Sequence, residues 1–137
     1  MSMNGRLENV YEEILAIIKS GRLGVAQVCV CSVNVEERKE DLLWRAEREL
    51  ALITAIFDDI AVDKETCKWI EKPYLHGFIT REYDNGCIAR CTYTAAPITN
   101  DTAFTVYGTK GELRYDTASG KITLFEQKPD CEGKEYY

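Results

Sequence analysis

The sequence predicts an α+β fold, in which an open, mainly antiparallel sheet of five to six strands carries two helices on one face. Two segments with helical periodicity lie in the first half of the chain, and a run of short strand-like segments separated by tight turns fills the second half. This order is typical of α+β proteins, because successive strands pair as hairpins while the helices gather on one face. The length of 137 residues fits one domain, which we expect to span residues 1–137.

The first helix is expected over about residues 9–19, where apolar residues recur at the spacing of one buried stripe. Asn9 and Glu12 form a capping-box pattern at its start, and Gly21 is a stop signal. The stripe consists of Val10, Ile14, Ile17 and Ile18.

A strand is expected at residues 25–35, with apolar side chains on both of its faces. This pattern predicts that both faces are covered, one by helices and the other by a partner subunit. The charged run at residues 36–41 is expected to be a solvated loop. A second helix is expected over residues 43–60, with a stripe made of Leu50, Ile53, Phe57 and Ile60.

The remaining strands are joined by turn sequences, of which Asn85-Gly86 is the strongest hairpin signal. Their expected ranges are 66–71, 75–83, 87–95, 103–107, 112–115 and 121–126. Alternation along the last strands assigns an aliphatic set to the helix-covered face, namely Phe104, Val106, Ile122 and Leu124. A second set is expected on the faces away from the helices: Thr105, Tyr107, Tyr115, Thr123 and Phe125.

Charge and cysteine content exclude several classes of protein. The net charge of −6 argues against a nucleic-acid binder with a broad basic surface and against an anionic membrane surface as partner. No apolar run approaches a membrane span, and the first residues lack a signal-peptide pattern, so we expect a soluble, cytoplasmic protein.

The six cysteines are expected to be free thiols that act as small core residues in a reducing compartment. Only Cys87 and Cys91 come near zinc-ligand spacing, and the single histidine, His76, supplies no second pair of ligands. The sequence therefore predicts no metal site.

Four motifs occur in a characteristic order: Ser20-Gly21-Arg22-Leu23-Gly24 after the first helix, Trp44-Arg45, Tyr83-Asp84-Asn85-Gly86, and the strand-turn-strand segment at residues 104–113. Together they resemble the second domain of the Gfo/Idh/MocA oxidoreductases, the family of glucose-fructose oxidoreductase, inositol dehydrogenase and the rhizopine-catabolism proteins. The resemblance spans about residues 6–126.

In that family a Rossmann domain that binds NAD or NADP precedes this domain, whose open sheet often makes subunit contacts and whose helical side helps to form the active site. The present sequence has no Gly-x-Gly-x-x-Gly turn, so the resemblance implies that the Rossmann domain is absent. We expect no cofactor site in this chain, and NAD or NADP only together with a Rossmann domain, which would then be its partner.

The resemblance also suggests three substrate-facing residues: Trp44, Arg45 and Asp59. The family's second helix carries a D-x-G-x-H-x-x-D pattern that supplies proton-transfer residues. With its last acid aligned on Asp59, Leu52 and Ile56 replace the first aspartate and the histidine. We therefore assign no catalytic residue.

The predicted function is that of the substrate-binding and oligomerisation domain of an NAD(P)-dependent oxidoreductase, inactive alone. Two alternatives are a free-standing dimerising interaction module and a small-ligand binder that uses the cleft between the second helix and the sheet. A homodimer is expected through the open sheet face, because a Thr/aromatic surface suits the docking of a second sheet in water. The contact residues are Thr105, Tyr107, Thr123 and Phe125.

Overall fold

The computed structural model describes residues 3–35, 39–95 and 100–126. Within these ranges the elements are α1 (Met3–Lys19), β1 (Ala26–Val35), α2 (Lys39–Ile56), β2 (Val62–Ile70), β3 (His76–Tyr83), β4 (Ile88–Ala95), β5 (Asp101–Gly108), β6 (Gly111–Asp116) and β7 (Lys121–Glu126). The α+β class is confirmed, but the count of five to six strands is wrong, because the sheet has seven. The strand expected at residues 66–71 is β2, which begins four residues earlier; it is an almost wholly exposed edge strand, so its alternation in the sequence is weak.

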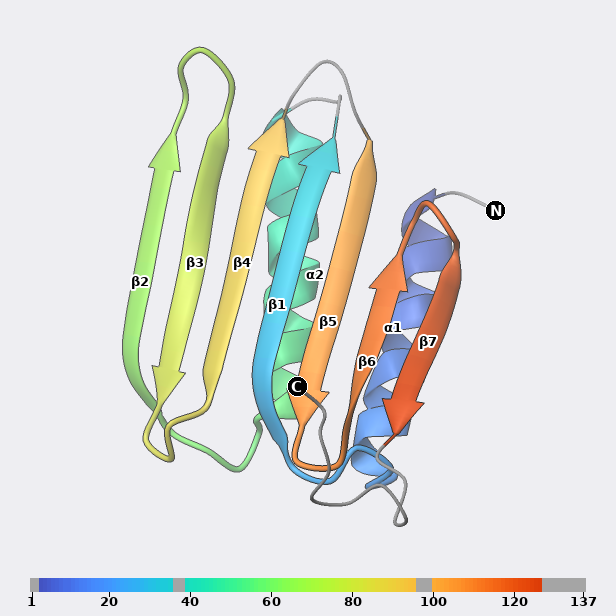
Figure 1. Cartoon of the computed structure of the whole chain (residues 1–137). Helices are drawn as coiled ribbons and strands as arrows, with labels where there is room; N and C mark the ends of the chain where they lie inside the picture. Colours follow the sequence, from blue (N-terminus) through green and yellow to red (C-terminus); the bar gives the residue numbers. More distant parts are fainter. Residues whose placement is uncertain (1–2, 36–38, 96–99, 127–137) are drawn as a thin grey trace, which may run out of the picture.

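All seven strands form one open, mixed sheet in the order β2-β3-β4-β1-β5-β6-β7 (Figure 1). Strand β1 is the central strand; it is parallel to β4 and antiparallel to β5. The other neighbouring strands are antiparallel. The first strand of the chain therefore separates two groups of three strands that come later in the sequence.

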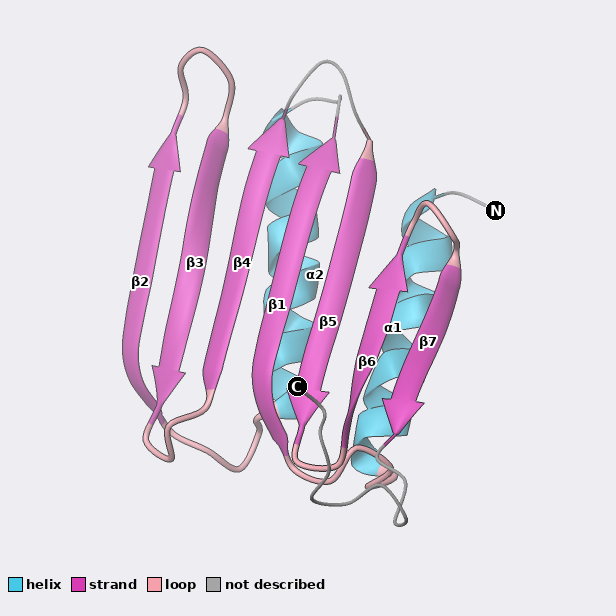
Figure 2. Cartoon of the chain, in the orientation of Figure 1, coloured by secondary structure: helices cyan, strands magenta, loops and turns pink. Residues whose placement is uncertain are grey.

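Both helices lie on the same face of the sheet, as expected (Figure 2). Helix α2 packs on β1 and β4, and α1 lies behind β6 and β7 (Figure 1). Within the described residues no helix covers β2 and β3 on this side. We refer below to the helix side and the open face of the sheet.

Helix α1 begins at Met3, so the predicted capping box at Asn9 and Glu12 is wrong: both residues lie inside the helix. The helix extends toward the N-terminus because its apolar stripe does. The buried members of the stripe are Leu7, Tyr11, Ile14 and Ile18. The predicted end is confirmed, since a turn follows Lys19 and Gly21 adopts φ +85°.

Helix α2 spans residues 39–56, four residues earlier at each end than expected. Part of the charged run predicted as a loop is therefore helical, and residues 36–38 lie outside the described residues. At the other end the chain leaves the helix in a turn, in which the Ile60 amide donates to the Phe57 carbonyl (3.1 Å). Two charged residues, Arg45 and Glu49, are buried among the apolar residues of its stripe.

Alternation separates the two faces of the sheet sharply. On β5, Phe104 and Val106 are buried on the helix side, as predicted, while Tyr107 is 40% exposed. Tyr115 is a correction: it is buried rather than on the open face, because its register partner is Phe104. On the open face of β1, Val30 is 39% exposed, so the described part of this chain covers only the helix side of the strand.

The predicted hairpin at Asn85-Gly86 is confirmed. Gly86 has φ +90°, and the Asn85 side chain accepts a hydrogen bond from the Cys87 amide (3.0 Å). Gly77 meets a different requirement, because a Cβ atom there would lie 2.7 Å from the Trp69 ring. The absent side chain lets Trp69 stack on Tyr93 across the row, with 5.6 Å between ring centroids.

Four of the predicted core thiols, those of Cys29, Cys31, Cys87 and Cys91, are buried and free, whereas Cys67 is free and exposed. Cys131 lies outside the described residues. None of the described helices is long and apolar enough to cross a membrane.

Candidate functional site

The three predicted substrate-facing residues lie in two separate places. Trp44 and Arg45 belong to the first half of α2, and Asp59 follows the end of that helix. The 11 residues from Arg45 to the last helical residue, Ile56, correspond to a rise of roughly 17 Å along the axis. The structure therefore does not bring the three residues into one site.

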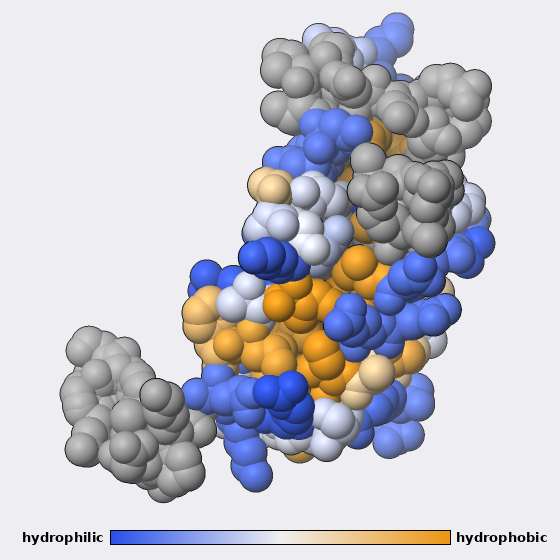
Figure 3. Space-filling model, turned by 90° about the vertical axis from the view of Figure 1, so that its right-hand side faces the viewer, coloured by the Kyte–Doolittle hydropathy of each residue, from blue (hydrophilic) through white to orange (hydrophobic). Residues whose placement is uncertain are grey.

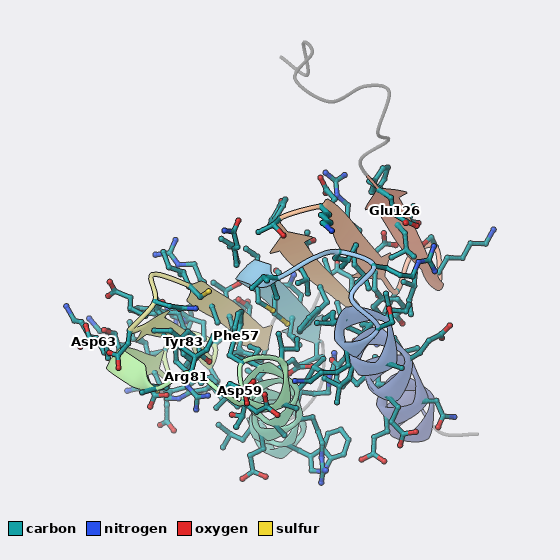
Figure 4. All side chains as sticks on the ribbon, turned by 90° about the horizontal axis from the view of Figure 1, so that it is seen from below. Phe57, Asp59, Asp63, Arg81, Tyr83 and Glu126 are labelled. Atoms are coloured by element: carbon teal, nitrogen blue, oxygen red, sulfur yellow. The ribbon has the colours of Figure 1, made fainter. Side chains whose placement is uncertain are left out.

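Asp59 is exposed just beyond the end of α2 (Figure 4). It lines a hollow of about 280 Å³ between the C-terminal ends of the two helices. Lys19 from α1 reaches across to the neighbouring Asp58, with Nζ 3.0 Å from Oδ1. This hydrogen bond lowers the pKa of the Asp58 carboxyl. The hollow is open to solvent and has an acidic border, so a polar ligand could reach the Asp59 carboxylate there.

A second group of side chains lies beside this end of α2, where Phe57, Arg81 and Tyr83 converge (Figure 4). The rings of Phe57 and Tyr83 pack with centroids 4.7 Å apart, and burial raises the pKa of the Tyr83 phenol. Arg81 donates to Glu65 on β2 (2.6 Å) and to Thr54 on α2 (2.9 Å). These contacts tie the β2–β3 hairpin to the helix and leave little of Arg81 for a ligand.

Trp44 is half-buried, and its ring lies under the Arg48 guanidinium, 4.9 Å from centroid to Cζ. Arg48 also lies 3.6 Å from the Glu8 carboxylate, across a groove between the two helices. The groove has a volume of about 310 Å³ and is lined by Glu8, Tyr11, Glu12, Leu15, Arg48, Ala51, Leu52 and Ala55. This groove is larger than the hollow beside Asp59. Trp44 does not line the groove; it contacts Arg48, which does.

Arg45 is buried, with 5% of its surface exposed, and faces the sheet. Its guanidinium donates to Thr102 on β5, and its Nε lies 3.6 Å from the carboxylate of Glu49. Tyr11 on α1 donates its hydroxyl proton to the same carboxylate. We call these four residues the buried polar cluster; it joins both helices to the centre of the sheet. The role of Arg45 toward a substrate stays a prediction.

Burial dominates the electrostatics of this cluster. It raises the pKa of Glu49, against the opposing effects of Arg45 and Tyr11, and it raises the pKa of Tyr11 far above its usual range. One oxygen of Glu49 and the Arg45 Nε have no hydrogen-bond partner among the described residues. Burial of a carboxyl group with incomplete hydrogen bonding lowers the stability of the folded state.

Sequence reasoning missed Glu49 and Tyr11. The available signal was position: Glu49 follows Arg45 by four residues and stands where the apolar stripe of α2 would continue. A charged pair inside an apolar stripe indicates a buried ion pair. Its partners Tyr11 and Thr102 could not be foreseen, because they are 38 and 57 residues away in the chain.

The four residues predicted for dimer contact all lie on the open face. Phe125 is 49% exposed and Tyr107 is 40% exposed. Thr105 is less exposed than either of them. The two aromatic residues flank Glu112 in one cross-strand row and border a hollow of about 380 Å³ beside the β5–β6 turn. The Arg114 guanidinium covers part of the Phe125 ring, at 5.1 Å from the centroid. The structure thus provides a mixed aromatic and charged surface that no other described element covers.

A further apolar surface lies at the edge where α1 meets β7. Seen from this edge, hydrophobic residues form a patch with hydrophilic residues around it (Figure 3). The partly buried hydrophobic residues of these two elements are Val10, Leu15, Ile17, Ile122 and Leu124. Among the described residues no group of three or more histidine, cysteine or carboxylate side chains is placed to hold a metal ion.

Comparison with solved structures identifies a shared fold. The chain superposes on the UDP-N-acetylglucosamine 3-dehydrogenase GnnA from Acidithiobacillus ferrooxidans with a TM-score of 0.70 at 9% identity, covering 89% of this chain and 42% of that one. The WlbA dehydrogenase from Bordetella pertussis, solved with NADH and UDP-GlcNAcA, gives 0.68 at 13% identity, with 86% and 44% covered. An inositol dehydrogenase homologue from Azotobacter vinelandii, solved with NADH and myo-inositol, gives 0.61 at 13% identity, with 93% and 43% covered.

No family model matches the sequence, and no curated protein matches it either. The likeness is therefore one of fold: this chain has the architecture of one part of these dehydrogenases. It spans less than half the length of each of them.

Proposed function

We propose that this chain is the substrate-binding and oligomerisation domain of an NAD(P)-dependent oxidoreductase of the Gfo/Idh/MocA type. The observation that carries the proposal is coverage: the dehydrogenase fold matches 86% to 93% of this chain but only 42% to 44% of each compared enzyme. In this proposal a Rossmann domain on another chain or segment binds the dinucleotide, and the single domain of this chain supplies the wall against which substrate is held.

The helix side supports a binding role without catalysis of its own. Leu52 and Ile56, at the positions of the family's proton-transfer residues, are apolar and buried in the core. Neither can accept or donate a proton. Asp59 and Trp44 are the accessible members of the predicted set: Asp59 lines the hollow at the C-terminal end of α2, and Trp44 packs under Arg48, a residue of the separate groove between the helices. Because the two positions are separate, we assign Asp59 to hydrogen bonding with substrate hydroxyl groups and Trp44 to apolar contact with a different part of the substrate.

A cofactor titration tests the first half of the proposal. In calorimetry, the isolated chain is expected to give no saturable heat with NADH or NADPH, because it lacks the glycine-rich turn that holds a pyrophosphate. A chimera with the Rossmann domain of the Azotobacter inositol dehydrogenase homologue should bind NADH. One-site binding by the isolated chain would contradict the proposal.

The same chimera tests the substrate wall. Polyols and UDP-sugars are added to its NADH complex while NADH fluorescence is followed, and a saturable change reports substrate beside the nicotinamide. Asp59→Ala and Trp44→Ala should weaken this response, whereas Glu47→Ala, an exposed residue on the same helix, should leave it intact. An equal response in all three variants would remove these residues from the substrate site.

The oligomerisation role rests on the open face. We propose a homodimer that buries about 1,200 Å² or more in total, the lower range for a specific interface. Light scattering at micromolar concentration should give twice the chain mass, and Phe125→Asp and Tyr107→Asp should each give the monomer. Glu12→Lys, on an exposed part of α1, is the matched control. A monomeric wild type, or a dimer that survives both aspartate variants, would remove this face as the contact.

A further inference from the structure

The open face also carries a hollow on β2, β3 and β4, away from the predicted dimer contacts. Its volume is about 260 Å³, and it is lined by Lys68, Ile70, His76, Gly77, Phe78, Thr92, Tyr93 and Thr94. Two cross-strand rows place these side chains together: Phe78 pairs with both Lys68 and Thr92, and His76 pairs with both Ile70 and Thr94. Three strands thus bring two basic side chains, two hydroxyl groups and two apolar side chains to one place.

The polar groups of this hollow are free to meet a ligand. Lys68 is exposed and forms no ion pair with any described residue. The Nδ1 atom of His76 lies 2.9 Å from the Tyr74 carbonyl oxygen, which can only accept, so Nδ1 carries the proton and donates it. This bond fixes the ring and leaves Nε2 as the nitrogen for a ligand.

The charge of this region is opposite to that of the whole chain. The protein has a net charge of −6, yet the open-face residues of β2, β3 and β4 include the cations Lys64, Lys68 and Arg90. The one acidic side chain that the register places on this face of the three strands is Glu82, whose pairing partner is Lys64 at the far end of β2. The local excess of positive charge therefore favours the approach of a small anion to this part of the open face.

We propose that this hollow binds the oxyanion group, carboxylate or phosphate, of a small molecule. Lys68 provides the ion pair, the hydroxyls of Thr92 and Thr94 donate hydrogen bonds, and His76 Nε2, an acceptor in this tautomer, takes a hydrogen bond from a hydroxyl group of the ligand. Ile70 and Phe78 form apolar walls for the body of the molecule. The proposal does not rest on the oxidoreductase assignment, because it uses neither the helix side nor a Rossmann domain.

The hollow is also separate from the predicted dimer contact. Strand β3, at its centre, lies three strand positions from β5, which is roughly 14 Å at the usual spacing of about 4.8 Å. A dimer restricted to β5–β7 leaves the hollow open. A dimer that spreads over the whole face would close it, so anion binding is measured in wild type and in Phe125→Asp, with the oligomeric state of each recorded by light scattering.

The single histidine makes the test direct, because only one residue of the whole chain contributes an imidazole Hε1 signal to the NMR spectrum. The signal is followed at fixed pH during titration with inorganic phosphate and, separately, with acetate, and chloride at equal ionic strength is the reference. We expect a saturable shift with phosphate or acetate and none with chloride; the tighter anion identifies the source of the oxyanion.

Two lysines on the same strand and face provide matched variants. Lys68→Ala should weaken the affinity about tenfold, the usual effect of losing one charged hydrogen bond, while Lys64→Ala should leave it unchanged. Both lysines are exposed, so neither variant is expected to unfold the chain. A shift that does not saturate, that chloride reproduces, or that Lys68→Ala leaves unchanged in both wild type and Phe125→Asp backgrounds would overturn the proposal.

Discussion

The helix side and the open face of the sheet are built from the same strands, yet they differ in almost every physical respect. Val106 is fully buried and its chain neighbour Tyr107 is 40% exposed. The helix side holds the core and the buried polar cluster, whereas the open face carries threonines, exposed aromatic rings and charges in mixed order. Packing on the helix side stabilises the fold, whereas the side chains of the open face are accessible to partners and ligands.

The largest expected effect compares two phenylalanines that lie on opposite faces two strands apart. Phe104→Ala should destabilise the chain by about 3–5 kcal/mol, because it leaves a cavity in a core that the helices close. Phe125→Ala, with half of its side chain exposed, should change the stability of the monomer by less than about 1 kcal/mol. Urea unfolding monitored by circular dichroism measures both values, and equal losses would contradict the division into two faces.

The buried polar cluster gives the next comparison. Arg45→Ala should cost about 3–5 kcal/mol of unfolding free energy, since it leaves the Glu49 carboxylate buried without its cation. The double variant Arg45→Met/Glu49→Leu should recover most of this loss. Arg22→Ala, which breaks an exposed pair with Glu126, is the control and should cost less than about 1 kcal/mol. If Arg45→Ala lowers the unfolding free energy by no more than Arg22→Ala does, the ion pair of Arg45 with Glu49 does not stabilise the fold.

The raised pKa of Glu49 predicts that the unfolding free energy depends on pH. Burial raises its pKa in the folded chain above the usual 4.5, so in the window above that value the folded state keeps a proton that the unfolded state has lost. Stability from this group is therefore greatest at the acid end and decreases as pH rises through the folded pKa. Glu49→Gln should abolish this decrease in urea titrations at successive pH values, while Glu12→Gln on the surface of α1 should preserve it.

The smallest effect concerns Tyr93, whose buried hydroxyl has no hydrogen-bond partner among the described residues. Tyr93→Phe should leave stability unchanged or raise it by up to about 1 kcal/mol, because the unmet polar group is removed while the stack on Trp69 is kept. Tyr107→Phe on the open face is the counterpart and should have no effect. A loss above 1 kcal/mol for Tyr93→Phe would show that its hydroxyl is satisfied in solution.

Local pattern was enough to predict the α+β class, both helices, the hairpin at Gly86 and the inward faces of β5 and β7. These features depend on periodicities of 2.0 and 3.6 residues, which short windows of sequence reveal. The starts of both helices were missed because the apolar pattern of each is strongest further along the chain, whereas α1 begins at Met3 and α2 at Lys39.

Long-range features escaped prediction for a different reason. The parallel pairing of β1 with β4, and the contact of Arg45 with Thr102, join residues that are far apart in the chain. No local spacing encodes such contacts. The burial of Tyr115 was missed in the same way, since it depends on the register of β6 against β5.

The central position of β1 has a consequence for how the protein is made. Both neighbours of this strand are encoded near or beyond the middle of the chain: β4 ends at residue 95 and β5 at residue 108. During translation, β1 and the apolar stripes of α1 and α2 are therefore synthesised several seconds before β4 and β5, at ordinary rates of synthesis. They cannot be buried in the sheet until those strands have been made. Until then the nascent chain exposes the apolar strand that will form its centre, and exposed apolar strands of this kind are prone to aggregate.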